Sequence, residues 1–200
     1  RRGMETKLKL IGILEEHKEG VHLRELSRLL ETGLPNVARY IGLLEQENVV
    51  ILQKEANLVK ARLRESPRTV AYLKKVNTEK FLALPIFVQK AVGDFLQELE
   101  TKPLMAVIFG SYAKGSFKER SDIDILLVFQ KIENEAGIEN AAKRISMRAN
   151  AKISPVYVDY KSFEHNYLDR QHGFSKEIRN KAIILLGAEH YYSLLWRFLA

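Results

Sequence analysis

Apolar residues recur at the spacing of amphipathic helices through the first part of the chain. A first helical run extends from Leu8 towards Val21, and Gly20 stops it. Two further helices are predicted, one over residues 23–30 and one over about residues 35–46. This pattern predicts that the chain opens with helices packed around one apolar core.

Two strand-like stretches come next. Residues 49–53 are rich in β-branched side chains, and residues 58–63 alternate apolar with basic side chains. Residues 54–57 separate the two stretches and are the predicted tip of a hairpin. Ser66-Pro67 then breaks the pattern, and a helical connector is predicted to run to about Leu99.

Strands and helices alternate through the last hundred residues. The first predicted strand of this part is apolar on both faces, so we expect it at the centre of its sheet. Strands are predicted over residues 104–109, 123–129, 153–160 and, as a short edge strand, 183–186. Helices are predicted to begin at Ser111 and Ser162 and to cover residues 135–149, 175–181 and 188–199.

Helices followed by a hairpin, over residues 1–70, resemble the winged helix-turn-helix domains of prokaryotic transcription regulators. In that family the third helix enters the major groove of DNA and the hairpin contacts the phosphate backbone. The resemblance implies helix contacts from Asn36, Arg39 and Tyr40 and hairpin contacts from Lys60, Arg62 and Arg64. A winged helix also favours a homodimer, because paired DNA half-sites are usual.

Charge and composition narrow the class of protein. The net charge is +7, and residues 1–80 hold 16 Lys and Arg against 11 Asp and Glu, which favours a nucleic-acid partner for this part. The absence of cysteine excludes a disulfide framework and a cysteine-based zinc site. The longest apolar runs are far too short to span a bilayer. We therefore expect a cytoplasmic protein with no membrane partner.

Candidate chemistry lies in the stretch IFGSYAKGSFKERSDIDILLVF, residues 108–129. Gly110 ends a buried strand and lets the backbone approach a ligand closely. Ser111 begins a helix, whose free N–H groups favour phosphate. Asp122 and Asp124 lie on one face of a strand, roughly 7 Å apart at Cα. Their carboxylates can converge on a hard cation such as Mg²⁺.

This stretch resembles the motif of the polymerase-beta-type nucleotidyltransferase superfamily, which joins an apolar residue, Gly, Gly or Ser, a gap, and an Asp-x-Asp pair. The likeness is closest to the small prokaryotic minimal nucleotidyltransferases, over about residues 100–187. The resemblance implies that Ser111 contacts the terminal phosphates of a nucleoside triphosphate and that Asp122 and Asp124 bind magnesium. By position, Lys114 and Arg120 are further candidates for phosphate contact.

Active members of this superfamily usually have a third carboxylate on a later strand. The likeness places Ser154 at that position. Asp159 is the one acid on the strand, but it lies at the far end and its side chain has the opposite parity. We retain Asp159 as a catalytic candidate; the alternative is that it caps the helix that begins near Ser162.

The predicted fold class is α+β in two domains. A winged helix-turn-helix over residues 1–70 and a helical connector over residues 71–100 precede an α/β nucleotidyltransferase fold with a small mixed sheet over residues 101–200. The expected function is magnesium-dependent transfer of a nucleoside monophosphate from a nucleoside triphosphate to the hydroxyl of an unidentified acceptor.

Two alternatives stay open. The first is a transcription regulator whose degenerate domain binds nucleotide without turnover, in place of the enzyme. The second is a pure interaction scaffold, which would bind neither nucleotide nor DNA. Some related minimal proteins are antitoxins that nucleotidylate a partner toxin. The candidate partners are therefore DNA, nucleotide, an acceptor protein such as a toxin, and a second copy of the chain.

Overall fold

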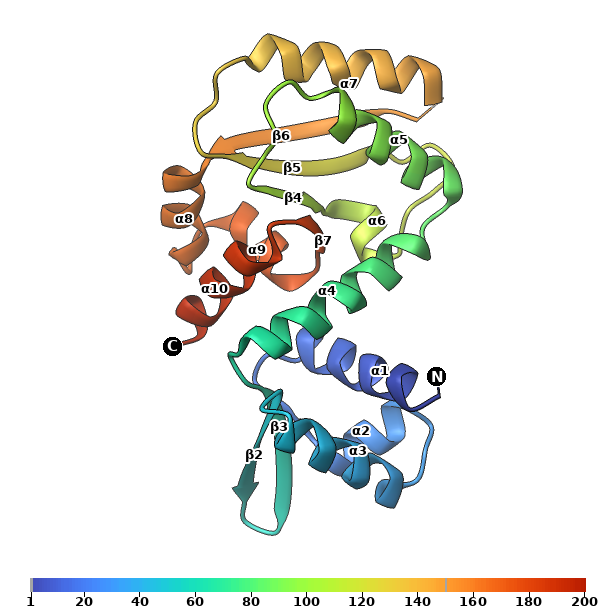
Figure 1. Ribbon diagram of the computed structural model, residues 1–200, viewed down its shortest axis with the longest axis vertical. Coiled ribbons are helices and arrows are strands. Elements are labelled where there is room, and N and C mark those ends of the chain that lie inside the picture. The colour runs from blue at the N-terminus through green and yellow to red at the C-terminus, as the bar shows by residue number, and fades with distance from the viewer. Residues whose placement is uncertain (1, 150) are drawn as a thin grey trace. The chain divides into compact units, whose positions relative to one another are not determined.

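The computed structural model describes residues 2–149 and 151–200. The chain divides into two compact units, residues 1–76 and 77–200, and the division falls within helix α4 (Pro67–Leu82) (Figure 1). Across the described residues the strands form two sheets, one of three strands and one of four. No helix in this part of the chain is both long and apolar enough to cross a lipid bilayer.

The first unit contains the predicted helices and hairpin. Its helices are α1 (Arg2–Glu16), α2 (Leu23–Leu29) and α3 (Leu34–Gln46), and their apolar faces bury Leu10, Ile11, Leu14, Leu26, Ile41 and Leu44. In its sheet, β3 (Leu58–Leu63) lies between β1 (Val21–His22) and β2 (Val50–Glu55), and both pairings are antiparallel.

The structure corrects one detail of the first predicted helix. Val21 was counted with its apolar run, but α1 ends at Glu16 and Val21 pairs with Ala61 in the sheet. Gly20 makes the turn between them with φ of +89°, a conformation that glycine adopts without strain. Val21 is therefore buried as part of a strand, and its helical spacing was coincidental.

The second unit is built on the mixed sheet that the sequence predicts. Its strands are β4 (Met105–Ile108), β5 (Ile123–Phe129), β6 (Ile153–Asp159) and β7 (Ile183–Leu186), in the order β6-β5-β4-β7. β5 and β6 are parallel, whereas β4 is antiparallel to both of its neighbours. The apolar strand β4 is central and β7 lies at an edge, as predicted.

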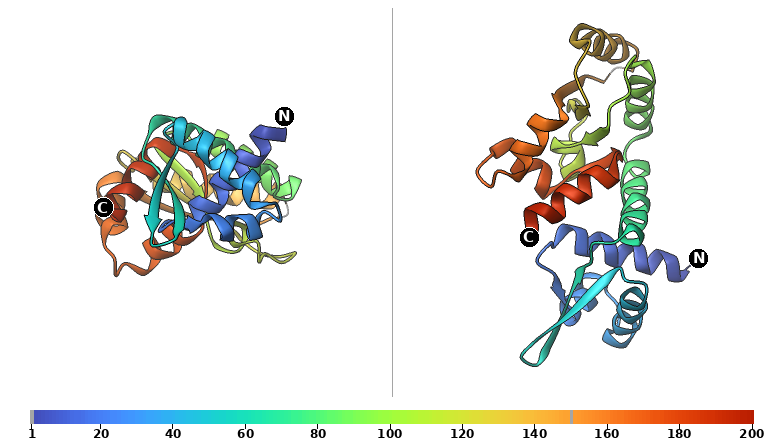
Figure 2. Two further views of the ribbon diagram at one scale, coloured as in Figure 1. Left: turned by 90° about the horizontal axis from the view of Figure 1, so that it is seen from below. Right: turned by 60° about the vertical axis from the view of Figure 1, so that its left-hand side comes forward.

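Helices cover both faces of this sheet. α5 (Ile86–Glu98) and α7 (Glu135–Ala149) share a buried core with alternate residues of β5, namely Ile123, Ile125, Leu127 and Phe129 (Figure 2). α8 (Tyr160–Leu168) and α10 (Ala188–Leu199) contact the sheet too, and α9 (Gly173–Asn180) packs against α8. Because side chains alternate along a strand, Asp124 faces away from the α5 and α7 core.

Candidate functional site

The ends of three strands meet at one edge of the larger sheet. β4 ends where β5 begins, and there the Phe109 N–H donates to the Asp124 carbonyl at 3.1 Å. β6 begins at the same edge because it is parallel to β5, and the Ile123 N–H donates to the Lys152 carbonyl at 2.7 Å. Backbone pairing therefore brings Gly110, the two aspartates and Lys152 together.

Position 110 requires glycine, because the backbone there lies against the Asp124 side chain. Its φ is +67°, in the left-handed region that favours glycine. A Cβ atom at this position would overlap the Oδ2 atom of Asp124. The sequence predicted a close approach of the backbone to a ligand, and the structure shows a close approach to the protein's own carboxylate.

Asp124 lies in an environment that disfavours its charged form. Burial raises the pKa of Asp124, and the negative charges of Asp122 and Glu177 raise this pKa further. Lys152 and Lys114 act in the opposite direction. A cation bound between the aspartates would relieve this strain, so the donor set fits a divalent metal.

The metal would need ligands from outside the protein. Within residues 2–149 and 151–200, no group of three or more His, Asp or Glu side chains is placed to hold a metal ion. Asp122 and Asp124 supply two carboxylates, and magnesium is usually held by one or two carboxylates plus water and substrate phosphates. The site therefore fits a metal that arrives with a phosphorylated ligand.

Lys152 and Glu177, which lie among the charged residues around Asp124, were not predicted from the sequence. The Lys152 ammonium lies 2.5 Å from Asp122 Oδ2, and the Lys114 ammonium lies 2.5 Å from Glu177 Oε1. Lys152 could have been found from its position just before a strand parallel to β5. Glu177 gave no such signal, because tertiary packing brings α9 to the site.

The residue beside Asp124 on β6 is Ser154, and Asp159 lies elsewhere. In the pairing of β5 with β6, Ser154 stands opposite Asp124 and Asp159 stands opposite Phe129, at the other end of the strand. The Asp159 carboxylate accepts hydrogen bonds from the N–H and hydroxyl of Ser162, at 3.0 and 2.9 Å. These hydrogen bonds lower the pKa of Asp159. The prediction of Asp159 as a catalytic residue is therefore corrected: it caps α8.

The phosphate-binding candidates lie on α6 (Gly110–Lys114) and the loop after it. Ser111 is half-buried, whereas Lys114 and Arg120 are exposed. α6 has five residues, so the helix dipole that was expected to favour phosphate is small. Any phosphate contact here rests mainly on the Ser111 hydroxyl and the lysines.

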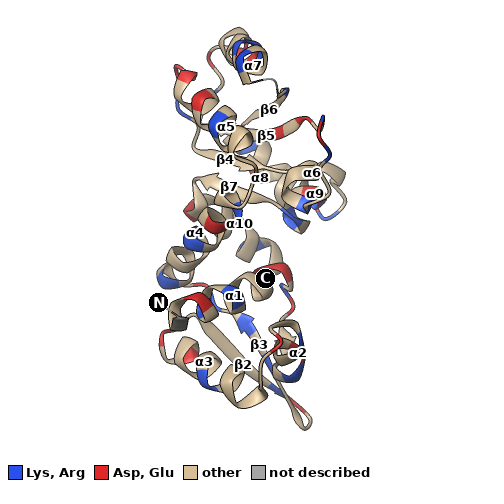
Figure 3. Ribbon diagram, turned by 90° about the vertical axis from the view of Figure 1, so that its right-hand side faces the viewer, with Lys and Arg blue, Asp and Glu red and all other residues tan. Residues whose placement is uncertain are grey.

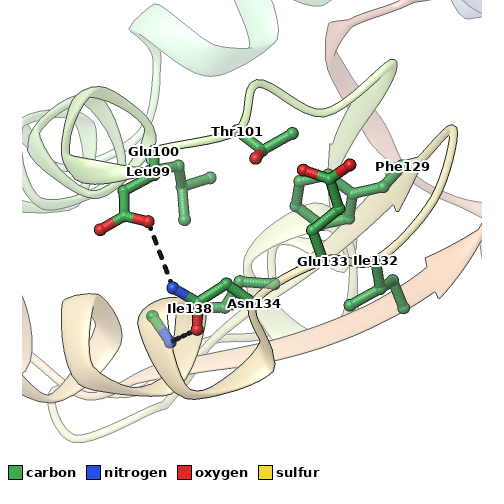
Figure 4. Close-up of a pocket in the computed structure, with 9 residues that line it drawn as sticks. Leu99, Glu100, Thr101, Phe129, Ile132, Glu133, Asn134 and Ile138 are labelled. Carbon is green, nitrogen blue, oxygen red and sulfur yellow. Dashed lines mark hydrogen bonds between the residues drawn. The ribbon is translucent and has the colours of Figure 1, made fainter.

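A small cavity lies at the opposite end of β5 from the aspartates. Phe129, the last residue of this strand, lines it together with Glu100, Ile132 and Asn134, and Asn134 donates to Glu100 at 3.2 Å (Figure 4). Its volume of about 20 Å³ is enough for roughly one water molecule. The cavity is therefore too small for a nucleotide and remote from the aspartates.

The helix residues predicted to contact DNA form a connected surface on α3. The Asn36 amide donates to the Thr32 hydroxyl at 3.2 Å and accepts from Arg39 at 3.2 Å. The Arg39 guanidinium stacks 4.5 Å above the centre of the Tyr40 ring. With Lys9 of α1, these residues line an open hollow of about 450 Å³.

Of the basic residues predicted on the hairpin, Arg62 and Arg64 are exposed and Lys60 is half-buried. Lys60 and Arg62 share the face of β3 opposite the buried Ala61, and Lys60 pairs with Glu55 across the hairpin at 3.6 Å. Arg64 follows β3 and donates to Asn48 at 2.7 Å. Acidic and basic residues are interspersed along the ribbon in Figure 3.

Comparisons with known proteins match this second unit. The family model described as Nucleotidyltransferase domain matches residues 90–185. The matched range includes Gly110, Ser111 and the aspartate pair, and residues 90–185 therefore carry a nucleotidyltransferase domain. This match supports nucleotidyl transfer in general, and the likeness to the minimal nucleotidyltransferases stays a prediction.

A relative in Methanocaldococcus jannaschii is named "Putative protein adenylyltransferase". It is 28% identical over 83 residues, which cover 40% of this chain and 83% of the relative. No solved structure matches the chain.

Proposed function

We propose that the protein transfers a nucleoside monophosphate from a magnesium-bound nucleoside triphosphate to a hydroxyl group. The observation that carries this proposal is the edge where Gly110-Ser111 lies beside Asp122 and Asp124, within the range that matches a nucleotidyltransferase domain. Asp122 and Asp124 would hold Mg²⁺. The Ser111 hydroxyl and the Lys114 ammonium would bind the triphosphate.

In the proposed reaction, the acceptor oxygen forms a bond with the α-phosphorus while the bond from that phosphorus to the bridging oxygen breaks. Pyrophosphate leaves, and the hydroxyl proton passes to solvent. A divalent cation, when bound, would neutralise negative charge on the phosphate oxygens. The protein residues orient the triphosphate so that the leaving group lies in line with the acceptor.

The acceptor that we propose is a hydroxyl group on a protein, with ATP as the donor. Support comes from the name of the relative in Methanocaldococcus jannaschii, which describes an adenylyltransferase that acts on protein. Lys114 is exposed and Asp122 and Glu177 are partly exposed, so a macromolecular acceptor can reach these charged groups.

We further propose that residues 1–70 form a winged helix-turn-helix that binds DNA and that residues 71–100 connect it to the transferase domain. The succession of α2, a turn and α3, followed by the β2–β3 hairpin, supports this proposal. So does the surface of α3 on which the exposed Arg39 contacts the half-buried Asn36 and Tyr40.

A second candidate function is nucleotide binding without turnover in a transcription regulator. The specific observation in its favour is Ser154, which stands beside Asp124 where an active enzyme of this superfamily would usually have a carboxylate. In this alternative Asp122 and Asp124 hold a nucleotide that acts as a signal.

Labelled ATP separates the two functions. The protein is incubated with magnesium and cell extract from its source, with ATP labelled either at the α-phosphate or at the γ-phosphate. Nucleotidyl transfer predicts that the α-label alone becomes covalently attached to a protein and that the Asp122→Asn/Asp124→Asn variant abolishes attachment. Binding of ATP without attachment of the α-label would favour the regulator.

A further inference from the structure

The loop before β6 places a lysine against the proposed metal site. The Lys152 ammonium lies 2.5 Å from Asp122 Oδ2. The backbone of Lys152 is fixed, because its carbonyl accepts the Ile123 N–H in the strand pairing. The Lys152 side chain is 70% exposed and the Asp122 side chain 38% exposed, so the pair faces the solvent from which a ligand enters.

This ion pair has little to contribute to the stability of the fold. Pairs between exposed lysines and carboxylates contribute little to stability, because water screens both charges. The backbone hydrogen bonds between β5 and β6 hold the same segments together without it. The position of Lys152 is therefore better explained by a role in the proposed metal site than by a contribution to folding.

An ammonium group bound to Asp122 competes with any metal for the same carboxylate. Lysine carries a compact point charge on a flexible stem and is a common ligand of phosphate. A triphosphate that arrives with a divalent cation offers the ammonium a new anionic partner, while the cation takes over Asp122. The flexible side chain allows the exchange without movement of the backbone.

A second pair between a lysine and a carboxylate, Lys114 with Glu177, also lies near Asp124. Lys114, which follows Gly110-Ser111 on α6, holds Glu177 at 2.5 Å. Phe174, near the start of α9, packs edge-on against Phe109 with ring centres 5.2 Å apart, which anchors this helix beside β4. Asp122 and Glu177, the two acidic neighbours of Asp124, are thus each paired with a lysine.

We propose that Lys152 is a phosphate-binding residue of this site, paired with Asp122 in the nucleotide-free protein and transferred to the triphosphate when metal-bound nucleotide enters. This inference rests on the proposed function. It predicts effects of opposite sign when Lys152 loses its charge: free metal binds more tightly, because a competitor is gone, and metal-bound nucleotide binds more weakly, because a phosphate ligand is gone.

The test uses the full chain with Mn²⁺ as the probe. Lys152→Met is compared with Lys143→Met, which removes the same charge from the exposed surface of α7. Binding of Mn²⁺ alone is followed by electron paramagnetic resonance, and binding of Mn²⁺–ATP by calorimetry. Lys152→Met should bind Mn²⁺ about threefold more tightly and Mn²⁺–ATP about tenfold more weakly, and Lys143→Met should change neither.

The outcomes distinguish this inference from the proposed function. Wild-type protein that binds Mn²⁺–ATP, with Lys152→Met equal to it in both titrations, overturns the role of Lys152 and leaves the proposed function standing. Wild-type protein that binds no Mn²⁺–ATP overturns both. Lys152→Arg keeps the charge, so recovery of nucleotide affinity in this variant supports a phosphate contact.

Discussion

The two units of the chain arrange their charges in different ways. In the second unit, carboxylates and lysines from α6, β5, the loop before β6 and α9 gather around the half-buried Asp124, whose pKa is raised by burial and by its acidic neighbours. In the first unit, Arg39 of α3 and Arg62 of the hairpin are exposed, Lys60 is half-buried, and these cations are spread along their elements. Burying a carboxylate beside other negative charges costs free energy, whereas an exposed charged side chain costs little.

The difference in burial between Asp124 and the cations of the first unit decides how much each site reveals about its ligand. A cation stabilises a carboxylate whose charged form the fold disfavours, so the raised pKa of Asp124 favours a cationic ligand at the second unit. An exposed basic surface is equally stable with or without DNA, and its role depends on the resemblance of the fold. The following changes test each side of the comparison, from the largest expected effect to the smallest.

Gly110→Ala should have the largest effect. A Cβ atom there overlaps the Asp124 carboxylate and the backbone φ is positive, so we expect destabilisation by about 3 kcal/mol and loss of Mg²⁺–ATP binding by about a hundredfold or more. Gly115→Ala is the matched control, because its φ is also positive but its Cβ would meet open space. Urea unfolding and calorimetry measure both effects. Equal behaviour of the two variants would contradict the role of Gly110.

Arg39→Ala tests the exposed surface of the first unit. If α3 reads DNA, the variant should lose about tenfold in affinity, the usual size for one good contact. Fluorescence anisotropy with duplexes selected by the wild-type protein gives the affinity at two salt concentrations. Lys143→Met, in the second unit, should change little. Failure of the wild-type protein to select or bind any duplex would refute the DNA-binding proposal.

Asp124→Asn should stabilise the protein while removing metal binding. The charged form of Asp124 is disfavoured in the folded state, so its removal at neutral pH should raise the free energy of unfolding by about 1 kcal/mol, as at other strained functional sites. The pKa of Asp124 is higher in the folded than in the unfolded state. The stability difference between the variant and the wild type should therefore shrink as the pH falls through the folded pKa, because the wild-type Asp124 side chain then becomes neutral like asparagine. Urea unfolding at several pH values measures this, with the exposed Asp94→Asn as control. A less stable Asp124→Asn variant would show that Asp124 is not strained.

Glu177→Gln should have the smallest effect. The substitution releases Lys114 from its ion pair and removes a negative charge from the approach of the triphosphate, so Mg²⁺–ATP should bind about threefold more tightly. Glu133→Gln, beside the cavity at the other end of β5, is the control for charge. Weaker binding would indicate instead that Glu177 itself holds the metal.

The strand pattern and the aspartate motif could be predicted from the sequence because both are local. β5 and the edge strand β7 appear at the predicted residues, and Gly110 lies beside Asp124 as the motif implies. Lys152 and Glu177 could not be predicted from a local motif, because pairing of distant segments brings them to the site. Lys152 reaches Asp122 through parallel strand pairing, and Glu177 arrives with a helix that follows β6 in sequence.

The errors have physical causes as well. Asp159 was the one acid available on its strand, but strand parity and its hydrogen bonds with Ser162 assign it to a helix cap. Val21 matched helical spacing while Gly20 had already turned the chain. For the first unit, the helices and hairpin are confirmed, and their use as a DNA-binding domain stays a prediction.

The central claim is that Asp122 and Asp124, of which Asp124 is held where its charged form is disfavoured, form a metal-dependent nucleotide site. Calorimetric titration of Mg²⁺–ATP and Mg²⁺–GTP into the wild-type protein, the Asp122→Asn/Asp124→Asn variant and the Asp94→Asn control tests it most directly. The account predicts that the wild type and the control bind at least one nucleotide, that binding requires magnesium, and that the double variant loses it. Equal binding by the double variant, or no binding by the wild type, would contradict the account.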